Sequence, residues 1–357
     1  MPQIEDLAAS ICGSIAGQHN DDKTSLTKGV STYFDKSKLI FTCPHEDLFK
    51  SLRGHWKIEE YEYRKSFQGD NYEASKGSAL ISKGDMGFSG STFFNTTDGK
   101  YLVKSVPRHF EHSFFKDEML EPYAEHMCQN LSSLLVRITD FLEADSNMSS
   151  TLGMAPAHHI VMENTKFGDQ EDKRKDVEWE TWDLKPMSYF YPERDVAGGA
   201  LTSEETKDKL ADDFSGNLVL TLDDAEDLKG NLQKDTAFLA KCNAVDYSLF
   251  LVRIPLNPDS PETKADGSSD VPLEPPILPP RVPTWRTGVK SADGKYIYRA
   301  CILDFFWAKH KVHAKAMTGL ISTYNLVGGH GPMSVTTTSR EYRERFLKMC
   351  EKMVEVK

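Results

Sequence analysis

The chain has 357 residues and a mass of 40.3 kDa, which is enough for one large domain or two domains of medium size. Hydrophobic residues make up 39% of it and charged residues 27%, a balance that excludes a disordered or fibrous protein. The formal net charge of -11 argues against sequence-independent binding to nucleic acid, because the phosphate backbone would be repelled.

The N-terminal sequence and the cysteines exclude further classes of protein. No apolar run reaches the roughly 20 residues that a membrane-spanning helix needs, and the start, MPQIEDLAAS, is acidic where a secretory signal would be basic. The six cysteines form no CxxC pair, so neither a disulfide framework nor a structural zinc site is indicated. We expect a cytoplasmic protein without a transmembrane segment.

Three strands are predicted between residues 78 and 106, in GSALIS, STFFNT and YLVKSV. An Asp-Gly turn at residues 97–100 joins the second strand to the third. A glycine-rich loop, GDMGFSGS at residues 84–91, joins the first to the second. Because no helix follows this loop, it does not fit a dinucleotide fingerprint or a Walker loop. It fits a hairpin lid over nucleotide phosphates, as in protein kinases, or a simple flexible turn.

Lys104 lies in the third of these strands with apolar residues on both sides. A lysine on the buried side of a strand requires an anionic partner. In a kinase this lysine binds ATP phosphates and pairs with a glutamate of the following helix, which we predict over residues 110–130. Glu111 is the candidate partner and Glu118 the reserve. The alternative is an edge-strand lysine in water.

The remaining elements indicate an α+β fold in two lobes. Strands are predicted at residues 136–141, 160–162 and 248–254, and a pair of strands at 289–304 joined by an Asp-Gly turn at 293–294. Helices are predicted at 235–243 and 340–354. Residues 257–283, rich in Pro, Ser and Asp, are expected to be a disordered insert. We therefore expect antiparallel sheets with packed helices, in an N-terminal lobe over residues 1–162 and a C-terminal lobe over 163–357.

Charge is unevenly distributed along the second lobe. Residues 163–235 contain 20 acidic residues against 10 basic ones, a local net charge of -10. Residues 281–315 contain eight Lys and Arg against two Asp, a local net charge of +6. This basic stretch is either a solvated face or a contact for an anionic partner.

Two aspartates stand at the ends of predicted elements. Asp246, in NAVDYSLFLV, lies between a helix and a strand, where a carboxylate could accept a hydroxyl proton. Asp304, in RACILDFFW, ends an apolar strand and suits a magnesium ion that bridges nucleotide phosphates. Each could instead be a helix cap or a turn residue. The order of glycine-rich hairpin, strand lysine, helical glutamate and two aspartates is that of a kinase site.

Several motifs carry a family resemblance. GFSGSTFF with YLVKSVPR, then HHIVMEN, WDLK, DTAFLAKCNAVDYSLFLV and CILDFF resemble the phosphatidylinositol phosphate kinase family, from about Asp47 to the C-terminus without the Pro-rich insert. The ending NLVGGHGPMSVTTTSREYRERFLKMCEKM is most similar to the phosphatidylinositol 3-phosphate 5-kinase branch.

The resemblance implies a fold and an activity. The fold would be the two-lobed kinase-like one that this family shares with SAICAR synthase. The activity would be ATP- and Mg²⁺-dependent phosphorylation of an inositol head group, at the 5-hydroxyl of phosphatidylinositol 3-phosphate in the branch named above. The lipid would lie in an anionic membrane surface, such as that of endosomes, and the chain would reach it by peripheral contact.

The resemblance also implies roles for individual residues. The loop that covers the ATP phosphates would consist of Gly87, Phe88, Ser89, Gly90 and Ser91. Lys104 would bind those phosphates with Glu111 as its partner, and the hinge beside adenine would be Met162 and Glu163. The catalytic aspartate would be Asp246, the metal ligand Asp304, and a further lysine near the phosphates Lys185. The residues that meet the lipid head group and the membrane would be Lys309, Lys311 and Lys315.

The sequence departs from the family pattern at several positions. The family motif DLKGS is here Asp183-Leu184-Lys185-Pro186-Met187, and Phe88 stands where relatives carry a lysine. These departures motivate a second hypothesis, a nucleotide-binding scaffold that has lost catalysis. Because the zinc finger and chaperonin-like region of the branch do not occur in this sequence, a kinase for a soluble inositol phosphate is the third.

Overall fold

A computed structural model describes residues 4–17, 40–68, 79–85, 91–144, 157–170, 172, 174, 177–186, 214, 216–256, 284–308 and 338–357. They form two compact units. The first runs from the N-terminus to His109 and includes Arg137–Phe167; the second holds Phe110–Val136 and the described residues from Gly168 onward. The sequence placed residues 110–136 in the first lobe. They belong to the second unit because they pack against its C-terminal strands and helices.

A six-stranded antiparallel sheet forms the framework of the first unit, in the order β1-β5-β6-β4-β3-β2. Its strands are β1 (Phe41–Thr42), β2 (Leu80–Asp85), β3 (Thr92–Thr96), β4 (Tyr101–Ser105), β5 (Ile138–Ala144) and β6 (His158–Glu163). The three strands predicted between residues 78 and 106 are confirmed as β2, β3 and β4. At the predicted Asp-Gly turn, Gly99 has a φ of 71°, a conformation that glycine adopts at little cost.

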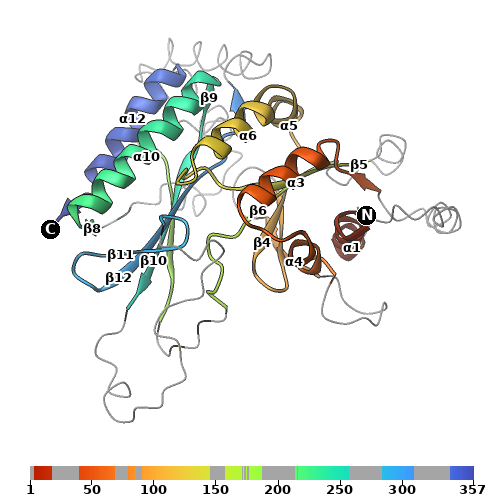
Figure 1. Cartoon of the computed structure of the whole chain (residues 1–357), viewed down its shortest axis with the longest axis horizontal. Coiled ribbons are helices and arrows are strands. Elements are labelled where there is room, and N and C mark those ends of the chain that lie inside the picture. The colour runs from red at the N-terminus through yellow and green to blue at the C-terminus, as the bar shows by residue number, and fades with distance from the viewer. Residues whose placement is uncertain are drawn as a thin grey trace, which may run out of the picture. The chain divides into compact units, whose positions relative to one another are not determined.

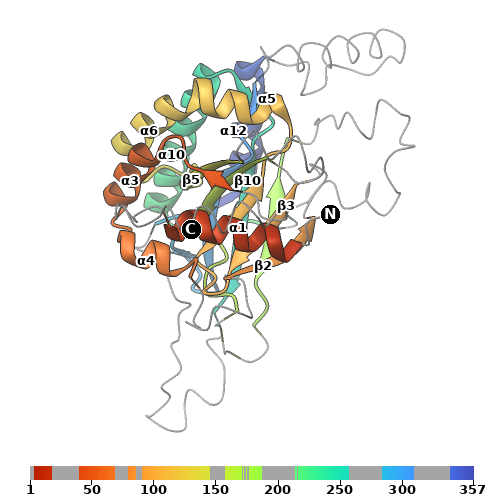
Figure 2. The ribbon, with the colours of Figure 1, turned by 90° about the vertical axis from the view of Figure 1, so that its right-hand side faces the viewer.

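Three helices, α1 (Ile4–Gly17), α3 (Glu46–His55) and α4 (Glu60–Lys65), complete this unit. In α1, Leu7, Ile11 and Ile15 are buried at a spacing of four residues and so share one face. This helix contacts both edge strands, β1 and β2, and therefore crosses the sheet, as Figure 2 shows. The sequence predictions did not include these three helices.

A buried arginine secures α3 to an irregularity of the sheet. The register of β5 against β6 shifts between Ile138 and Asp140. The Nη1 atom of Arg53 donates to the carbonyl oxygen of Thr139, inside this bulge, at 2.6 Å. The same guanidinium lies 3.5 Å from Oδ2 of Asp140 and 2.6 Å from Oε1 of Glu60. The bulge carbonyl is thereby satisfied away from water, which an interior polar group requires.

The second unit is built on a four-stranded antiparallel sheet in the order β11-β12-β10-β7. Its strands are β7 (Glu180–Leu184), β10 (Ser248–Pro255), β11 (Val289–Lys290) and β12 (Tyr296–Leu303). Two short ribbons accompany it: antiparallel β9 (Ala244–Val245) with β13 (Trp307–Ala308), and parallel β8 (Leu218–Leu220) with β14 (Val354–Val356).

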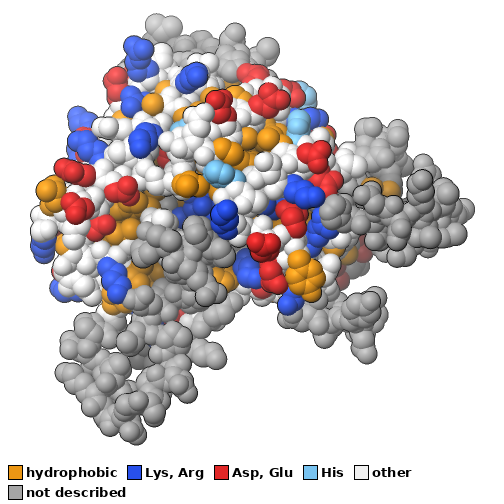
Figure 3. All heavy atoms as spheres, in the orientation of Figure 1, with side chains coloured by type: hydrophobic (Ala, Val, Ile, Leu, Met, Phe, Trp, Pro, Cys, Tyr) orange, Lys and Arg blue, Asp and Glu red, His pale blue; other side chains and the backbone are white. Residues whose placement is uncertain are grey.

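The helices of the second unit are α5 (His109–Phe114, which begins at the unit boundary), the π-helical turn η1 (Phe115–Met119), α6 (Leu120–Gln129), α10 (Leu222–Lys241) and α12 (Ser339–Lys352). The first three run without a break and correspond to the helix predicted over residues 110–130. Helices α10 and α12 pack side by side (Figure 1). Side chains of both signs are interspersed over them (Figure 3).

Helix α10 begins at Leu222, well before the helix predicted over residues 235–243. Thr221 caps it, because its side-chain oxygen accepts from the backbone N–H of Asp224 at 3.2 Å. The first half of this helix is mostly polar, and its buried residues there are Leu228 and Asn231, so its apolar periodicity is weak. Among the described helices, none combines the length and apolarity that crossing a membrane requires.

His159, in β6, is a buried neutral imidazole. Its ring lies edge-on to Phe41, with centroids 5.1 Å apart, and neither ring nitrogen has a hydrogen-bond partner among the described residues. Burial, with a smaller contribution from His158, lowers the pKa of His159 to about 3. The unfolded chain binds a proton there below about pH 6.5, so stability present above that pH is lost as the pH falls toward 3.

We therefore predict that His159→Phe makes unfolding less sensitive to acid. Relative to the wild type, the variant should gain about 2 kcal/mol of unfolding free energy between pH 7.5 and pH 5, as measured by urea denaturation. The control is His158→Gln, which changes a partly exposed neighbour 3.4 Å from Glu143 and should keep the acid loss. Parallel pH curves for His159→Phe and the wild type would contradict the assignment.

Candidate active site

Two short connectors of the second unit carry the predicted aspartates. Asp246 and Tyr247 join β9 to β10, and residues 304–306 join β12 to β13. Ser248, the first residue of β10, pairs with Leu303, the last of β12, while Val245 pairs with Trp307. The two connectors are therefore bracketed by antiparallel pairings on both sides. This register brings Asp246 and Asp304 to the same end of the sheet.

Lys185 reaches this end from the neighbouring strand. Leu184 is the last residue of β7 and pairs with Leu249 of β10. Lys185, the next residue along the chain, therefore lies beside the β9–β10 connector. Its Nζ lies 2.7 Å from Oδ1 of Asp246, a hydrogen-bonded ion pair in which both side chains are half-buried. Two of the residues predicted to act in catalysis are thus in direct contact.

Both aspartates have an unusual backbone. The φ of Asp246 is 69° and that of Asp304 is 60°, in the left-handed region. A residue with a Cβ pays about 1 to 2 kcal/mol there, although Asp tolerates it better than most. Residues in such conformations cluster at active sites, where the surrounding structure holds them. Neighbouring residues must therefore hold both aspartates in this backbone conformation.

Three consecutive aromatic residues follow Asp304, and each meets an aromatic ring of the segment α5-η1-α6. Trp307 lies edge-on to Phe110 at 4.6 Å between centroids, Phe306 meets Phe115 at 5.2 Å, and Phe305 stacks on Tyr123 at 6.0 Å. Each such pair contributes about 0.5 to 1.5 kcal/mol beyond the burial of its area. The helical segment thus fixes the connector after Asp304.

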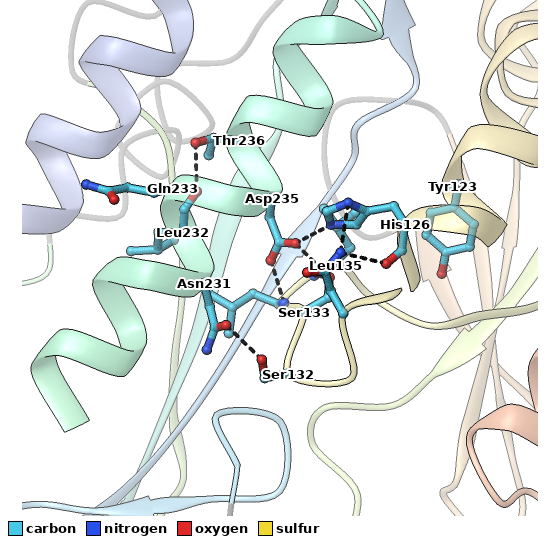
Figure 4. Close-up of polar contacts among 12 residues, drawn as sticks. Tyr123, His126, Ser132, Ser133, Leu135, Asn231, Leu232, Gln233, Asp235 and Thr236 are labelled. Carbon is cyan, nitrogen blue, oxygen red and sulfur yellow. Dashed lines mark hydrogen bonds and ion pairs between the residues drawn. The ribbon is translucent and has the colours of Figure 1, made fainter. Parts of the chain in front are cut away.

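The strand before Asp304 is fixed through Asp235 of α10, a fully buried residue whose polar contacts are drawn in Figure 4. Its carboxylate accepts from the backbone N–H of Leu134 at 2.6 Å and from the hydroxyl of Ser133 at 2.8 Å, and lies 2.6 Å from Nε2 of His126. Leu134 in turn accepts from the N–H of Ile302, two residues before Asp304, at 2.7 Å. Asp235 therefore anchors the segment against which the end of β12 is aligned.

Of the predicted nucleotide-binding residues that the structure describes, all but Glu111 lie in the first unit. Lys104, on β4, is only 7% exposed, and its Nζ lies 5.4 Å from the ring centroid of Phe93. Of the two alternatives that the sequence left open for this residue, the structure shows the buried lysine and not an edge-strand lysine in water. Ser91, just before β3, is also buried. Glu111, in the first turn of α5, belongs to the second unit, so its pairing with Lys104 stays a prediction. Gly87, Phe88, Ser89 and Gly90 lie outside the described residues, as do Lys309, Lys311 and Lys315.

The two predicted hinge residues end β6 and are buried. The carboxylate of Glu163 pairs with Arg137 at 3.2 Å, and its backbone N–H donates to the carbonyl oxygen of Arg137 at 3.0 Å. Asn164 then donates from Nδ2 to the carbonyl oxygen of Gly99 at 2.7 Å, which joins the end of β6 to the β3–β4 turn. The side chain of Glu163 is therefore a structural partner of Arg137, and the place of Met162 and Glu163 beside adenine stays a prediction.

The donor set fits a nucleotide with a magnesium ion. Mg²⁺ is usually bound by one or two carboxylates together with substrate phosphates, so Asp304 alone suffices from the protein side. The described residues hold no group of three or more His, Cys, Asp or Glu that would form a site without phosphates. A lysine paired with a carboxylate beside that ligand fits the transfer of a phosphoryl group.

Sequence reasoning missed two residues of this arrangement, Arg137 and Asp235. Asp235 opens the motif DTAFLAKCN but received no role, because an aspartate within a helix ordinarily faces solvent. Arg137 follows the apolar run LLV and precedes a strand. A charged residue beside an apolar run was the available signal for Arg137, whereas Asp235 follows Gln233 and Lys234 and gives no such signal.

Comparisons with known proteins agree with this chemistry. A family model described as Phosphatidylinositol-4-phosphate 5-Kinase matches residues 74–274, more than half of the chain. The matched range includes Lys104, Lys185 and Asp246. A protein of Plasmodium falciparum (isolate 3D7) named phosphatidylinositol 4-phosphate 5-kinase is 27% identical over 221 residues. The aligned region is 59% of this chain and 12% of that relative, so the chain spans a small part of the relative's length.

We predict that Asp235→Ala destabilises the second unit. The change leaves the N–H of Leu134 and the hydroxyl of Ser133 buried without their acceptor, at a cost of about 3 kcal/mol in unfolding free energy. Chemical denaturation measures this cost. Glu226→Ala, at an exposed position of the same helix, should cost about 0.5 kcal/mol or less. Equal costs for the two variants would show that Asp235 is not the anchor.

Proposed function

Because the chain belongs to the phosphatidylinositol-4-phosphate 5-kinase family, we propose that it transfers the γ-phosphoryl group of ATP to a hydroxyl of the inositol ring of a phosphatidylinositol phosphate. The observation that carries the proposal is the Lys185–Asp246 pair, 2.7 Å long, at the same end of the sheet as Asp304. A base, a cation and a metal ligand are the parts that such a transfer needs.

In this proposal the carboxylate of Asp246 orients the attacking inositol hydroxyl and accepts its proton. The bond between phosphorus and the β–γ bridging oxygen breaks, a bond from phosphorus to the inositol oxygen forms, and ADP leaves. Lys185, held by Asp246 before the substrate arrives, is within reach of the transferred group and neutralises part of its charge. Lys104 and the loop at residues 87–91 hold the remaining phosphates. Asp304 would hold Mg²⁺, which would supply charge stabilisation for the transfer.

The proposed lipid is phosphatidylinositol 3-phosphate, phosphorylated at the 5-hydroxyl. This proposal depends on the C-terminal sequence NLVGGHGPMSVTTTSREYRERFLKMCEKM. Phosphatidylinositol 4-phosphate is the competing substrate, since it appears in the name of the Plasmodium relative. We propose peripheral contact with an anionic membrane through Lys309, Lys311 and Lys315, each worth about 1 kcal/mol near such a surface.

The replacement Asp246→Asn keeps the size of the side chain and removes its basicity. We predict that kcat falls at least about 100-fold while MgATP still binds, because general-base catalysis contributes about 10² to 10⁴ in rate. Lipid-dependent ATP turnover and nucleotide titration measure the two effects. Asp293→Asn is the matched control, because Asp293 lies in the β11–β12 turn at the far end of β12 from Asp304. Normal turnover by Asp246→Asn would refute the role of this residue.

A substrate panel tests the proposed reaction. Phosphatidylinositol 3-, 4- and 5-phosphates in vesicles and the corresponding soluble head groups would be compared, with magnesium and with EDTA. We expect magnesium-dependent turnover of the 3-phosphate lipid and a product phosphorylated at positions 3 and 5. Preference for the 4-phosphate lipid would show that phosphatidylinositol 4-phosphate is the substrate. Equal use of soluble head groups would favour the hypothesis of a soluble substrate. Nucleotide binding without any turnover would favour the scaffold.

A further inference from the structure

Helix α12 contacts the connector that carries Asp246. Tyr342, in the first turn of this helix, is fully buried, and its hydroxyl donates to the carbonyl oxygen of Tyr247 at 2.5 Å. Tyr247 is the residue directly after Asp246. A side chain from the C-terminal helix is thus bonded to the backbone next to the proposed catalytic base. Tyr342 lies beyond residues 74–274, which the family model matches.

The ring of Tyr247 is held by the same helix. It is fully buried and lies edge-on to Tyr342 at 4.7 Å and to Phe346 at 4.9 Å between centroids. Tyr342 and Phe346 are four residues apart and so share one face of α12. The helix therefore fixes Tyr247 twice, through its carbonyl group and through its ring.

Helix α12 is also bonded to α10, which leads into the connector from the other side. The hydroxyl of Ser339 donates to the carbonyl oxygen of Ala240 at 3.0 Å, and Nε of Arg343 donates to the hydroxyl oxygen of Thr236 at 3.1 Å. Between these contacts and Tyr247 stand two non-glycine residues in the left-handed region, Asn243 and Asp246. Such residues persist only where the surrounding structure holds them.

We propose that Tyr342 is a positioning residue for the phosphoryl transfer described above, and that it acts by holding Asp246 in its left-handed conformation against Lys185. The proposal rests on the proposed function. With the carbonyl group and the ring of Tyr247 fixed, Asp246 has little freedom to return to a commoner backbone conformation. Its carboxylate therefore stays at the Lys185 amine and does not have to be ordered during each turnover, which is the advantage of preorganisation.

The test is Tyr342→Phe, which keeps the ring and its packing and removes only the hydroxyl. We expect kcat to fall about threefold to tenfold while the KM for MgATP stays unchanged, because one hydrogen bond to the connector is lost. Hydrogen exchange in a peptide that covers residues 244–250 should become faster in the same variant. The matched control is Ser339→Ala, which removes a hydroxyl-to-carbonyl bond from the same helix to α10 and should leave kcat and the exchange of 244–250 near wild type.

The two readouts separate this proposal from the proposed function. If the wild type turns over no phosphoinositide, the proposed function fails, while faster exchange in Tyr342→Phe and not in Ser339→Ala still establishes the hold on the connector. If Tyr342→Phe leaves both kcat and exchange unchanged, the positioning role is overturned. It is equally overturned if the two variants slow turnover and speed exchange alike, since the effect would then come from general loosening of α12.

Discussion

The antiparallel pairing of β10 with β12 is the constraint on which the candidate site depends. Its register, with Ser248 opposite Leu303, places one aspartate-bearing connector beside the other. A shift of this pairing by a single residue would turn every side chain of β10 to the opposite face relative to β12 and would move Asp246 away from Asp304. The short β9–β13 pairing fixes the register on the other side of the connectors. Two separate strand pairings therefore place the two connectors side by side.

Buried charges in both units are satisfied by partners that join elements distant in sequence. In the first unit Arg53 fills the bulge of β5, and Arg137 neutralises Glu163 at the end of β6. In the second unit Asp235 accepts a hydrogen bond from the N–H of Leu134, and the carbonyl oxygen of Leu134 accepts from the N–H of Ile302. An uncompensated charge would be expensive in each place, so these groups specify a single arrangement of the chain. The elements that carry the proposed chemistry are thereby held by polar anchors as well as by apolar packing.

The sequence predicted the elements whose signal is local. The strand YLVKSV follows from its β-branched and aromatic residues, and the two Asp-Gly turns follow from the need for a positive φ. The contact of Lys185 with Asp246 was beyond prediction, because it depends on the pairing of β7 with β10 across 61 residues. The early start of α10 was missed because a polar helix has little apolar periodicity. The role of Tyr342 depends on where a helix at the end of the chain packs, which no local pattern specifies.

Because it contains the π-helical turn η1, the α5-η1-α6 segment positions its aromatic rings only with its present number of residues. Successive residues of an α-helix are about 100° apart around its axis, so deletion of one residue between Phe115 and Met119 would rotate Phe110 relative to Tyr123 by about that angle. The two rings could then no longer meet Trp307 and Phe305 together. Natural variants of this stretch should therefore conserve its number of residues even where individual side chains change, a constraint on spacing that differs from the usual constraint on identity.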